Sequence, residues 1–215
     1  MSLKNLPKDE IANSITHGLA TIAGFFGTVY YIYIGLKLGG LLQLFYLLLF
    51  AVSMILVYLF STLYHLSELD GKWKLFFEKL DHSAIFLLIA GTYTPLMMFA
   101  LGNTLGLIIL TVNWCLALIG ILLEISGMLK SRKLALIFYL SMGWLLIFAL
   151  KSLIFDTPFF ACVLLFGGAI FYNLGVFFYV KQKKLYFHAI WHIFVLLGSI
   201  CHYFSILLLF FNLHK

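Results

Sequence analysis

The chain has 215 residues, of which 64% are hydrophobic and only 10% are charged, and its formal net charge is +6. Globular domains are roughly 45–50% apolar and about 25% charged, because a soluble domain of this length cannot bury more apolar surface. The composition therefore excludes a water-soluble protein and predicts an integral membrane protein.

Seven apolar segments follow one another along the sequence, at about 13–36, 41–66, 80–101, 104–128, 134–153, 158–180 and 186–212. They reach or exceed the roughly 20 residues with which an α-helix crosses a bilayer. None shows the apolar and polar alternation of a transmembrane β-strand. The predicted fold is an all-α integral membrane protein, a seven-transmembrane-helix bundle that forms a single domain over 1–215.

The positive charges gather at alternate ends of these segments. Three of the 14 Lys and Arg fall on one side, at Lys37, Lys151 and Lys215. The other eleven fall on the side of the N-terminus, at Lys4, Lys8, Lys72, Lys74, Lys79, Lys130, Arg132, Lys133, Lys181, Lys183 and Lys184. Positive residues mark cytoplasmic loops, so we expect a cytoplasmic N-terminus and an external C-terminus. The positive net charge then needs no nucleic acid to explain it, and no nucleic-acid partner is expected.

The longest connection, 67–79, carries Glu68, Asp70 and Lys72 among its charges and is predicted as a cytoplasmic loop. Asp81 would then stand at the start of the third helix. Aspartate is a preferred N-cap there, and the helix dipole favours an anion. This capping role is compatible with a role in a metal site.

The last apolar segment begins with His188 and His192, four residues apart. On an α-helix this spacing places both imidazoles on one face, with Cβ atoms about 6 Å apart. Such a pair can supply two of the three protein ligands of a catalytic zinc that keeps a position for water. The alternative is a pair of interfacial histidines that are hydrogen-bonded to backbone carbonyls.

Other polar residues are predicted at the same end of the bundle. Ser61 and His65 end the second segment, Asp81 begins the third, and His17 lies near the start of the first. Ionisable groups in spanning helices usually face a cavity or each other. For Ser61 and His65 the alternative is a simple polar helix end, whereas His17 could line the cavity or support the metal ligands.

Two further residues have structural interpretations. His202 lies ten residues beyond His192, which places it roughly 15 Å deeper along the helix and outside the same site. A hydrogen bond to Asn113 or Asn173 is expected for it. Glu124 is expected to pair with Lys130 or with a neighbouring helix.

Five short motifs occur in order along nearly the whole chain: DEIANSITHG (9–18), STLYH (61–65), LDHS (80–83), AGTYTP (90–95) and HAIWH (188–192). Together they resemble the bacterial hemolysin III family, which is similar to the progestin and adiponectin receptors and, more remotely, to alkaline ceramidases. The resemblance implies a multi-pass protein of the bacterial plasma membrane. It also implies Zn²⁺ bound by His65, His188 and His192, with Asp81 at the acidic position that holds the zinc water and Ser61 at the family's serine.

These observations lead to three hypotheses about function. The first is a zinc-dependent hydrolase of a lipid amide or ester at the inner leaflet, in which Asp81 takes a proton from water and Ser61 helps to stabilise the oxyanion. Membrane lipids would then be its partners. The second is a pore-forming haemolysin, and the third is a receptor or regulator of the lipid state of the membrane, in which zinc is structural.

Overall fold

The computed structural model describes residues 6–67, 71–129 and 131–215. Within these ranges seven helices are long and apolar enough to cross a membrane, which confirms the predicted all-α membrane bundle. The elements are α1 (Lys8–Leu38), α2 (Leu41–Leu66), α3 (Lys72–Ala100), α4 (Thr104–Ile125), α5 (Arg132–Trp144), the 3-10 turn η2 (Leu145–Ala149), α6 (Leu150–Phe155), α7 (Phe159–Val180) and α8 (Phe187–Asn212). The three elements α5, η2 and α6 together make one of the seven spans, Arg132–Phe155.

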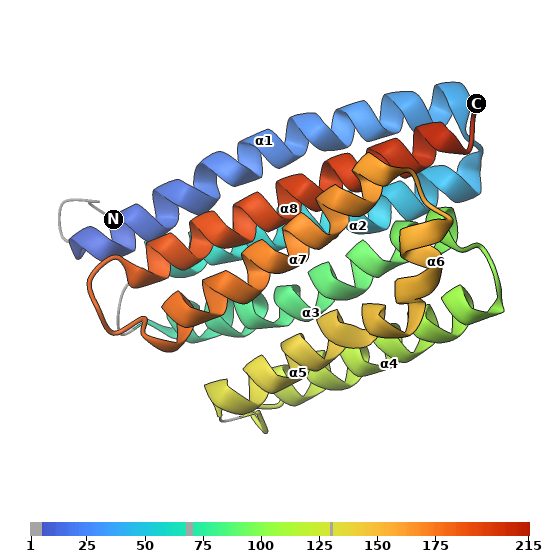
Figure 1. Cartoon of the computed structure of the whole chain (residues 1–215). Coiled ribbons are helices and arrows are strands. Elements are labelled where there is room, and N and C mark those ends of the chain that lie inside the picture. The colour runs from blue at the N-terminus through green and yellow to red at the C-terminus, as the bar shows by residue number, and fades with distance from the viewer. Residues whose placement is uncertain (1–5, 68–70, 130) are drawn as a thin grey trace.

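Short connections make consecutive spans antiparallel. Gly39 and Gly40 separate α1 from α2, and Gly102 with a φ of +61° turns the chain between α3 and α4. Asn103 then caps α4, because its side chain accepts a hydrogen bond from the Gly106 amide at 3.0 Å. The end of α2 and the starts of α1, α3 and α8 therefore lie at one end of the bundle, and α8 ends at the opposite end (Figure 1).

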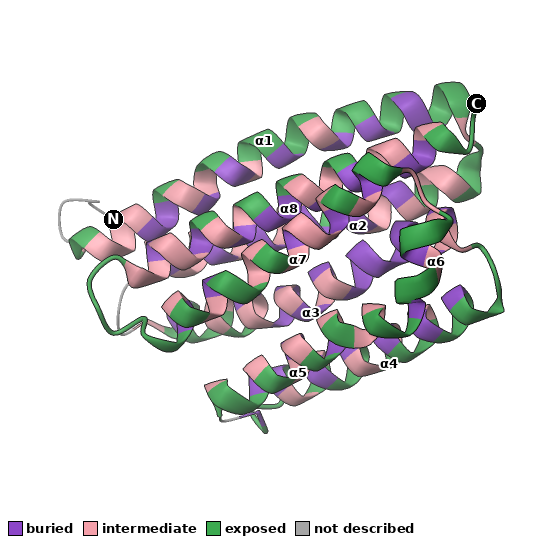
Figure 2. Cartoon of the chain, in the orientation of Figure 1, coloured by how far each residue is buried: buried purple, intermediate pink, exposed green. Residues whose placement is uncertain are grey.

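Helix α3 is the central helix of the bundle. In its most apolar stretch 72% of the residues are buried, against 44% or less in the other six spans. One core cluster joins it to α1, α2 and α8 around Tyr31, Phe50 and Phe210, and a second joins it to α4 and α5 around Phe86 and Met142. Figure 2 shows buried residues along α3 and exposed residues along the outer faces of the peripheral helices.

The fifth span is interrupted by a side chain from α3. The Tyr93 hydroxyl donates to the Gly143 carbonyl at 2.7 Å and accepts from the Leu146 amide at 2.9 Å. A hydroxyl inserted in this way breaks the regular ladder of a helix. The segment expected as one helix over 134–153 is therefore α5, η2 and α6 in succession.

The expected start of the third helix was wrong. Helix α3 begins at Lys72 with Gly71 as its N-cap, so residues 72–79 are helical rather than part of a loop. Asp81 consequently lies nine residues inside α3 and does not cap it. Glu68 and Asp70, expected in the same loop, lie outside the described residues.

The close contact between α2 and α3 yields a testable prediction. A Cβ added at Gly91 would lie 2.7 Å from the Leu49 carbonyl oxygen, whereas one added at Gly167 in α7 meets nothing within 4 Å. Alanine favours a helix over glycine, so only the steric clash can destabilise Gly91→Ala. We expect the free energy of unfolding of this variant to be lower by about 1–3 kcal/mol, and its melting temperature in detergent to be lower as well. The control Gly167→Ala should melt no lower than the unchanged protein, and equal melting of the two variants would contradict the packing.

Candidate metal centre

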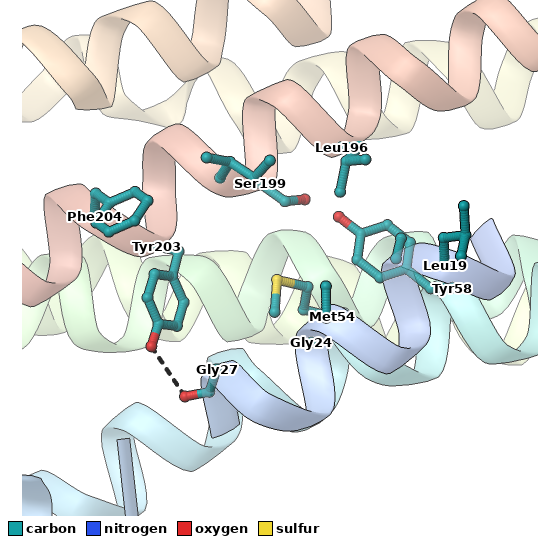
Figure 3. Close-up of a pocket in the computed structure, with 12 residues that line it drawn as sticks. Leu19, Gly24, Gly27, Met54, Tyr58, Leu196, Ser199, Tyr203 and Phe204 are labelled. Carbon is teal, nitrogen blue, oxygen red and sulfur yellow. Dashed lines mark hydrogen bonds between the residues drawn. The ribbon is translucent and has the colours of Figure 1, made fainter. Parts of the chain in front are cut away.

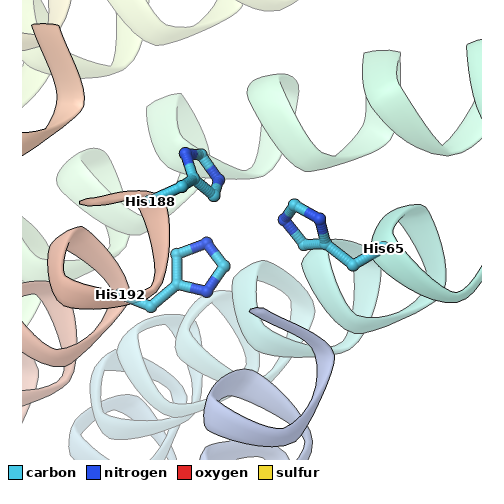
Figure 4. Close-up of side chains that lie close together, drawn as sticks. All are labelled: His65, His188 and His192. Carbon is cyan, nitrogen blue, oxygen red and sulfur yellow. The ribbon is translucent and has the colours of Figure 1, made fainter. Parts of the chain in front are cut away.

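Three histidines from two helices face one another at the end of the bundle where α1 begins. His65 lies in the last turn of α2, and His188 and His192 lie in the first two turns of α8. One ligand nitrogen from each lies within 4.8 Å of the others. The ring centroids of His188 and His192 are 4.5 Å apart, and that of His65 is 5.1 and 5.2 Å from them. Figure 4 shows the three rings around a common space.

Each of the three rings has its Nδ1 atom beside an oxygen. The partner of His65 is Glu10 Oε2 at 2.5 Å, and that of His188 is Gln182 Oε1 at 2.7 Å. His192 Nδ1 lies 3.1 Å from the Thr16 hydroxyl oxygen and 3.3 Å from the Asn13 carbonyl oxygen. The Thr16 hydroxyl donates its own hydrogen to that carbonyl at 2.8 Å, so toward His192 its oxygen acts as an acceptor. Carboxylate and carbonyl oxygens only accept hydrogen bonds, so each Nδ1 carries the proton. The lone pair of each neutral ring is then on Nε2.

The Nε2 atom of His65 provides a test of whether these residues fit a metal ion. It is buried and has no hydrogen-bond partner within the described part of the chain. A buried polar atom without a partner is costly, and metal coordination is one way of satisfying it. Three imidazole nitrogens, each oriented by a hydrogen bond at the other ring position, are the usual arrangement around a transition-metal ion. The residues present therefore fit such an ion.

The orienting partners were missed at the sequence level. Glu10 and Asn13 both lie on the helical face of α1 that also carries His17, at spacings of three and four residues. That spacing was the available signal for a polar face of α1 directed at the histidines. No sequence pattern indicated the contact of Gln182 with His188. Gln182 lies in the connection between α7 and α8, and its partner depends on how this connection folds.

His17 lies beside the three-histidine group without belonging to it. Its ring stacks on that of His192, with centroids 3.6 Å apart and an interplanar angle of 14°. Both of its ring nitrogens are buried and have no hydrogen-bond partner among the described residues. Its ring also contacts that of Tyr58 at 5.1 Å. His17 thus packs directly against one of the three clustered histidines and lies between that group and Tyr58.

Asp81 and Ser61 also lie next to this group. Asp81 is buried on α3, close enough to interact electrostatically with His65, but it is not one of the residues whose ligand atoms cluster. Ser61 lies one helical turn before His65 and is a near neighbour of Asp81. Its hydroxyl is buried and makes no hydrogen bond within the described ranges. Both side chains are therefore buried near the three histidines, and Asp81 lies outside the cluster of ligand atoms.

The expected partners of His202 were wrong. Its Nε2 atom lies 3.2 Å from the Leu165 carbonyl oxygen on α7. Asn113 instead donates to the Met142 carbonyl, and Asn173 donates to the Ala169 carbonyl of its own helix. His202 packs against Gly168, where an added Cβ would clash with its ring, so α7 rather than α4 lies on this side of α8.

Glu124 takes part in a second polar cluster. Its Oε1 atom accepts a hydrogen bond from Arg132 at 2.9 Å and lies 3.4 Å from His82 Nδ1. Tyr139 donates to the His82 carbonyl at 2.9 Å. These contacts tie α4 and α5 to α3, as expected for pairing with a neighbouring helix, while Lys130 lies outside the described residues.

An apolar cavity of about 300 Å³ lies between α1, α2 and α8 (Figure 3). Leu19 and Phe204 line it and are exposed on the outer surface of the bundle, whereas Tyr58 and Ser199 are buried at its inner side. Ser199 follows His192 by seven residues, which is about 10 Å along α8. The cavity therefore lies deeper along the bundle than the histidines, and Tyr58 connects it to them through the ring of His17.

A family model and two individual proteins of similar sequence all point to one family. The family model described as Haemolysin-III related matches residues 6–203. A "Hemolysin-3 homolog" of Bacillus subtilis (strain 168) is 42% identical over 200 residues, which cover 93% of each chain. A "Hemolysin-3" of Bacillus cereus is 41% identical over 200 residues, which cover 93% of this chain and 91% of that protein.

The metal centre predicts the outcome of a metal analysis. The protein as purified should carry about one transition-metal ion per chain, because three oriented imidazoles bind such ions tightly. The double variant His188→Ala/His192→Ala lacks two of the three ligands and should retain almost no metal. Inductively coupled plasma mass spectrometry would measure the metal content. The control is His214→Ala, since His214 follows the C-terminal end of α8, whereas His188 and His192 lie at the N-terminal end of this helix. Equal metal content in the double variant and the unchanged protein would contradict the site.

Proposed function

Because the chain belongs to the Haemolysin-III related family, we propose that it is a zinc-dependent hydrolase that cleaves an amide or ester bond of a membrane lipid at the inner leaflet. It is a multi-pass bacterial membrane protein. The proposal therefore concerns what the polar end of its helix bundle does within that membrane.

The observation that carries the proposal is the three-histidine group beside the buried carboxyl of Asp81. Three nitrogen ligands and one open coordination position are typical of catalytic zinc. Ca²⁺ and Mg²⁺ instead prefer oxygen ligands. A zinc ion at such a site supplies Lewis acidity and makes water nucleophilic near neutral pH. The imidazoles His65, His188 and His192 would hold this ion through their Nε2 atoms.

Two further residues have roles in the proposed reaction. Asp81 would orient the attacking water and accept its proton, which requires a carboxylate near the ligands but outside the ligand set. Ser61 would donate its hydroxyl hydrogen to the carbonyl oxygen of the substrate as negative charge develops there. Both side chains are buried, so their interactions with the substrate would be only weakly screened by water.

The cavity between α1, α2 and α8 supports a lipid as substrate. Its lining is nearly all apolar, and its lining residues Leu19 and Phe204 face outward, where the bilayer surrounds a spanning bundle. A pocket of this size suits a hydrocarbon chain better than a polar molecule. Membrane lipids are thus the proposed partners. No nucleic-acid partner is proposed, because the positive-inside rule accounts for the excess of Lys and Arg.

Cytolysis is the second candidate, because the two relatives are named Hemolysin-3 and Hemolysin-3 homolog. Under this hypothesis the protein would release dye from lipid vesicles into which it has been reconstituted. The tightly packed apolar core around α3 makes a water-filled path within one bundle unfavourable. Vesicle leakage without lipid cleavage would therefore favour this candidate. Zinc retention with neither activity would favour a lipid-sensing regulator with structural zinc.

The proposed base is tested by Asp81→Asn. The change keeps the shape of the side chain and removes its charge, so zinc should stay bound while lipid turnover in proteoliposomes falls by about 10²–10⁴-fold. Untargeted lipid mass spectrometry would measure the turnover, and elemental analysis would measure zinc. Asp156→Asn is the control, since Asp156 follows the fifth span at the end of the bundle opposite the histidines. Wild-type turnover by a zinc-loaded Asp81→Asn protein would exclude Asp81 as the base.

The proposed orientation puts the N-terminus and the three histidines on the cytoplasmic side. The order of apolar segments along the sequence assigns eleven of the 14 Lys and Arg to that side. A reporter that is active only in the cytoplasm should be active after Lys183 and inactive after Lys215. The opposite result would place the polar end of the bundle outside the cell and would overturn access from the inner leaflet.

A further inference from the structure

We propose that Glu10, supported by Lys74, is a positioning residue that sets the metal affinity of the centre through His65. The inference rests on the metal assignment made in the proposed function, but not on lipid hydrolysis. It also gives a role to α1, which supplies none of the three ligands and yet contacts two of them. Glu10 contacts His65, and the Thr16 hydroxyl and the Asn13 carbonyl contact His192.

The contact between Glu10 and His65 is short and shielded. Glu10 Oε2 lies 2.5 Å from His65 Nδ1, and the side chains are 18% and 4% exposed. A hydrogen bond to an ionised carboxylate is about twice as strong as a neutral one. Asn13 Nδ2 lies 3.4 Å from the same ring nitrogen, but an amide N–H cannot bond to a nitrogen that already carries a proton. Glu10 is therefore the partner that fixes the tautomer of His65.

Lys74 restrains the other oxygen of Glu10. Its Nζ atom lies 3.4 Å from Glu10 Oε1 and donates to the Tyr64 carbonyl at 2.9 Å. It also lies 4.1 Å from the centre of the Tyr64 ring. A buried ammonium group is retained only where such partners compensate for lost hydration. Lys74 thus connects the start of α3 with Glu10 on α1 and with the residue directly before His65 on α2.

This arrangement affects metal binding for two reasons. The carboxylate holds the His65 ring in one orientation, so less freedom is lost when Nε2 binds an ion. Its negative charge also stabilises the positive charge that the ring gains as a ligand, which makes Nε2 a stronger donor. Loss of such a partner typically weakens metal affinity by about 10–100-fold. A residue that merely held α1 against α2 would instead change stability and leave affinity unchanged.

The test is the zinc affinity of Glu10→Gln in the full-length purified protein. Glutamine keeps the size and can still accept a hydrogen bond, but it removes the charge. Zinc alone is the probe, titrated against a chromogenic chelator, and we expect a Kd that is about 10–100-fold higher than for the unchanged protein. The matched control is Asp9→Asn, which removes the same charge one residue away and about 100° around α1. Its Kd should be unchanged.

Two further measurements separate positioning from folding. Co²⁺ bound to Glu10→Gln should keep the visible spectrum of the unchanged protein, because all three ligands remain. Lys74→Gln keeps the Glu10 carboxylate but removes the contact that restrains it, so the zinc Kd of this variant should rise by a smaller factor. If Glu10→Gln does not fold, Lys74→Gln takes its place as the test. A zinc Kd within about twofold of the unchanged protein in both variants would overturn the proposal. Absence of zinc binding by the unchanged protein would overturn the metal assignment as well, whereas zinc binding without lipid cleavage would overturn only the hydrolase.

Discussion

The hydrogen bond from the Nδ1 atom of an imidazole to an oxygen is the interaction on which the polar end of this protein depends. It occurs at all three clustered histidines, with oxygens from the Glu10 and Gln182 side chains and, at His192, from the Thr16 hydroxyl and the Asn13 backbone. Each bond selects one tautomer and one ring orientation. Without these bonds the rings could rotate, and their Nε2 atoms would not share one space. The partners come from α1 and from the connection before α8, so the centre requires that these segments are assembled around α2.

The membrane imposes the second constraint, which is that every helix must satisfy its backbone within itself or through neighbours. Helix α3 meets this demand from the centre of the bundle. Its Tyr93 hydroxyl bonds to the backbone where α5 gives way to η2, and Gly91 lets α2 approach closely. The same helix carries Lys74 and Asp81 to the polar end. A rigid central helix thus links the packing of the bundle to the residues beside the histidines.

Much of the fold and part of the site could be predicted, because chain connectivity in a membrane is simple. Apolar runs of spanning length predict the helices, and antiparallel connection puts His65, Asp81 and His188 at one level. The start of α3 was predicted wrongly because Lys72 and Lys74 were interpreted as loop residues. A charge pattern does not reveal that Lys74 is satisfied by Glu10 and by the Tyr64 carbonyl, which are distant in sequence. The same limitation hid the contact of Glu10 with His65.

The sequence by itself determined the number of spanning helices, the end of the bundle that holds each polar residue, and the His188–His192 pair on one face. These properties follow from helix rise and periodicity, which are local. Only the tertiary structure decided the rotation of each helix and its neighbours. It turned His202 toward Leu165 rather than Asn113, stacked His17 on His192, and brought Glu10 to His65. Rotation and neighbours are set by how side chains from distant segments pack, and no local pattern encodes that packing.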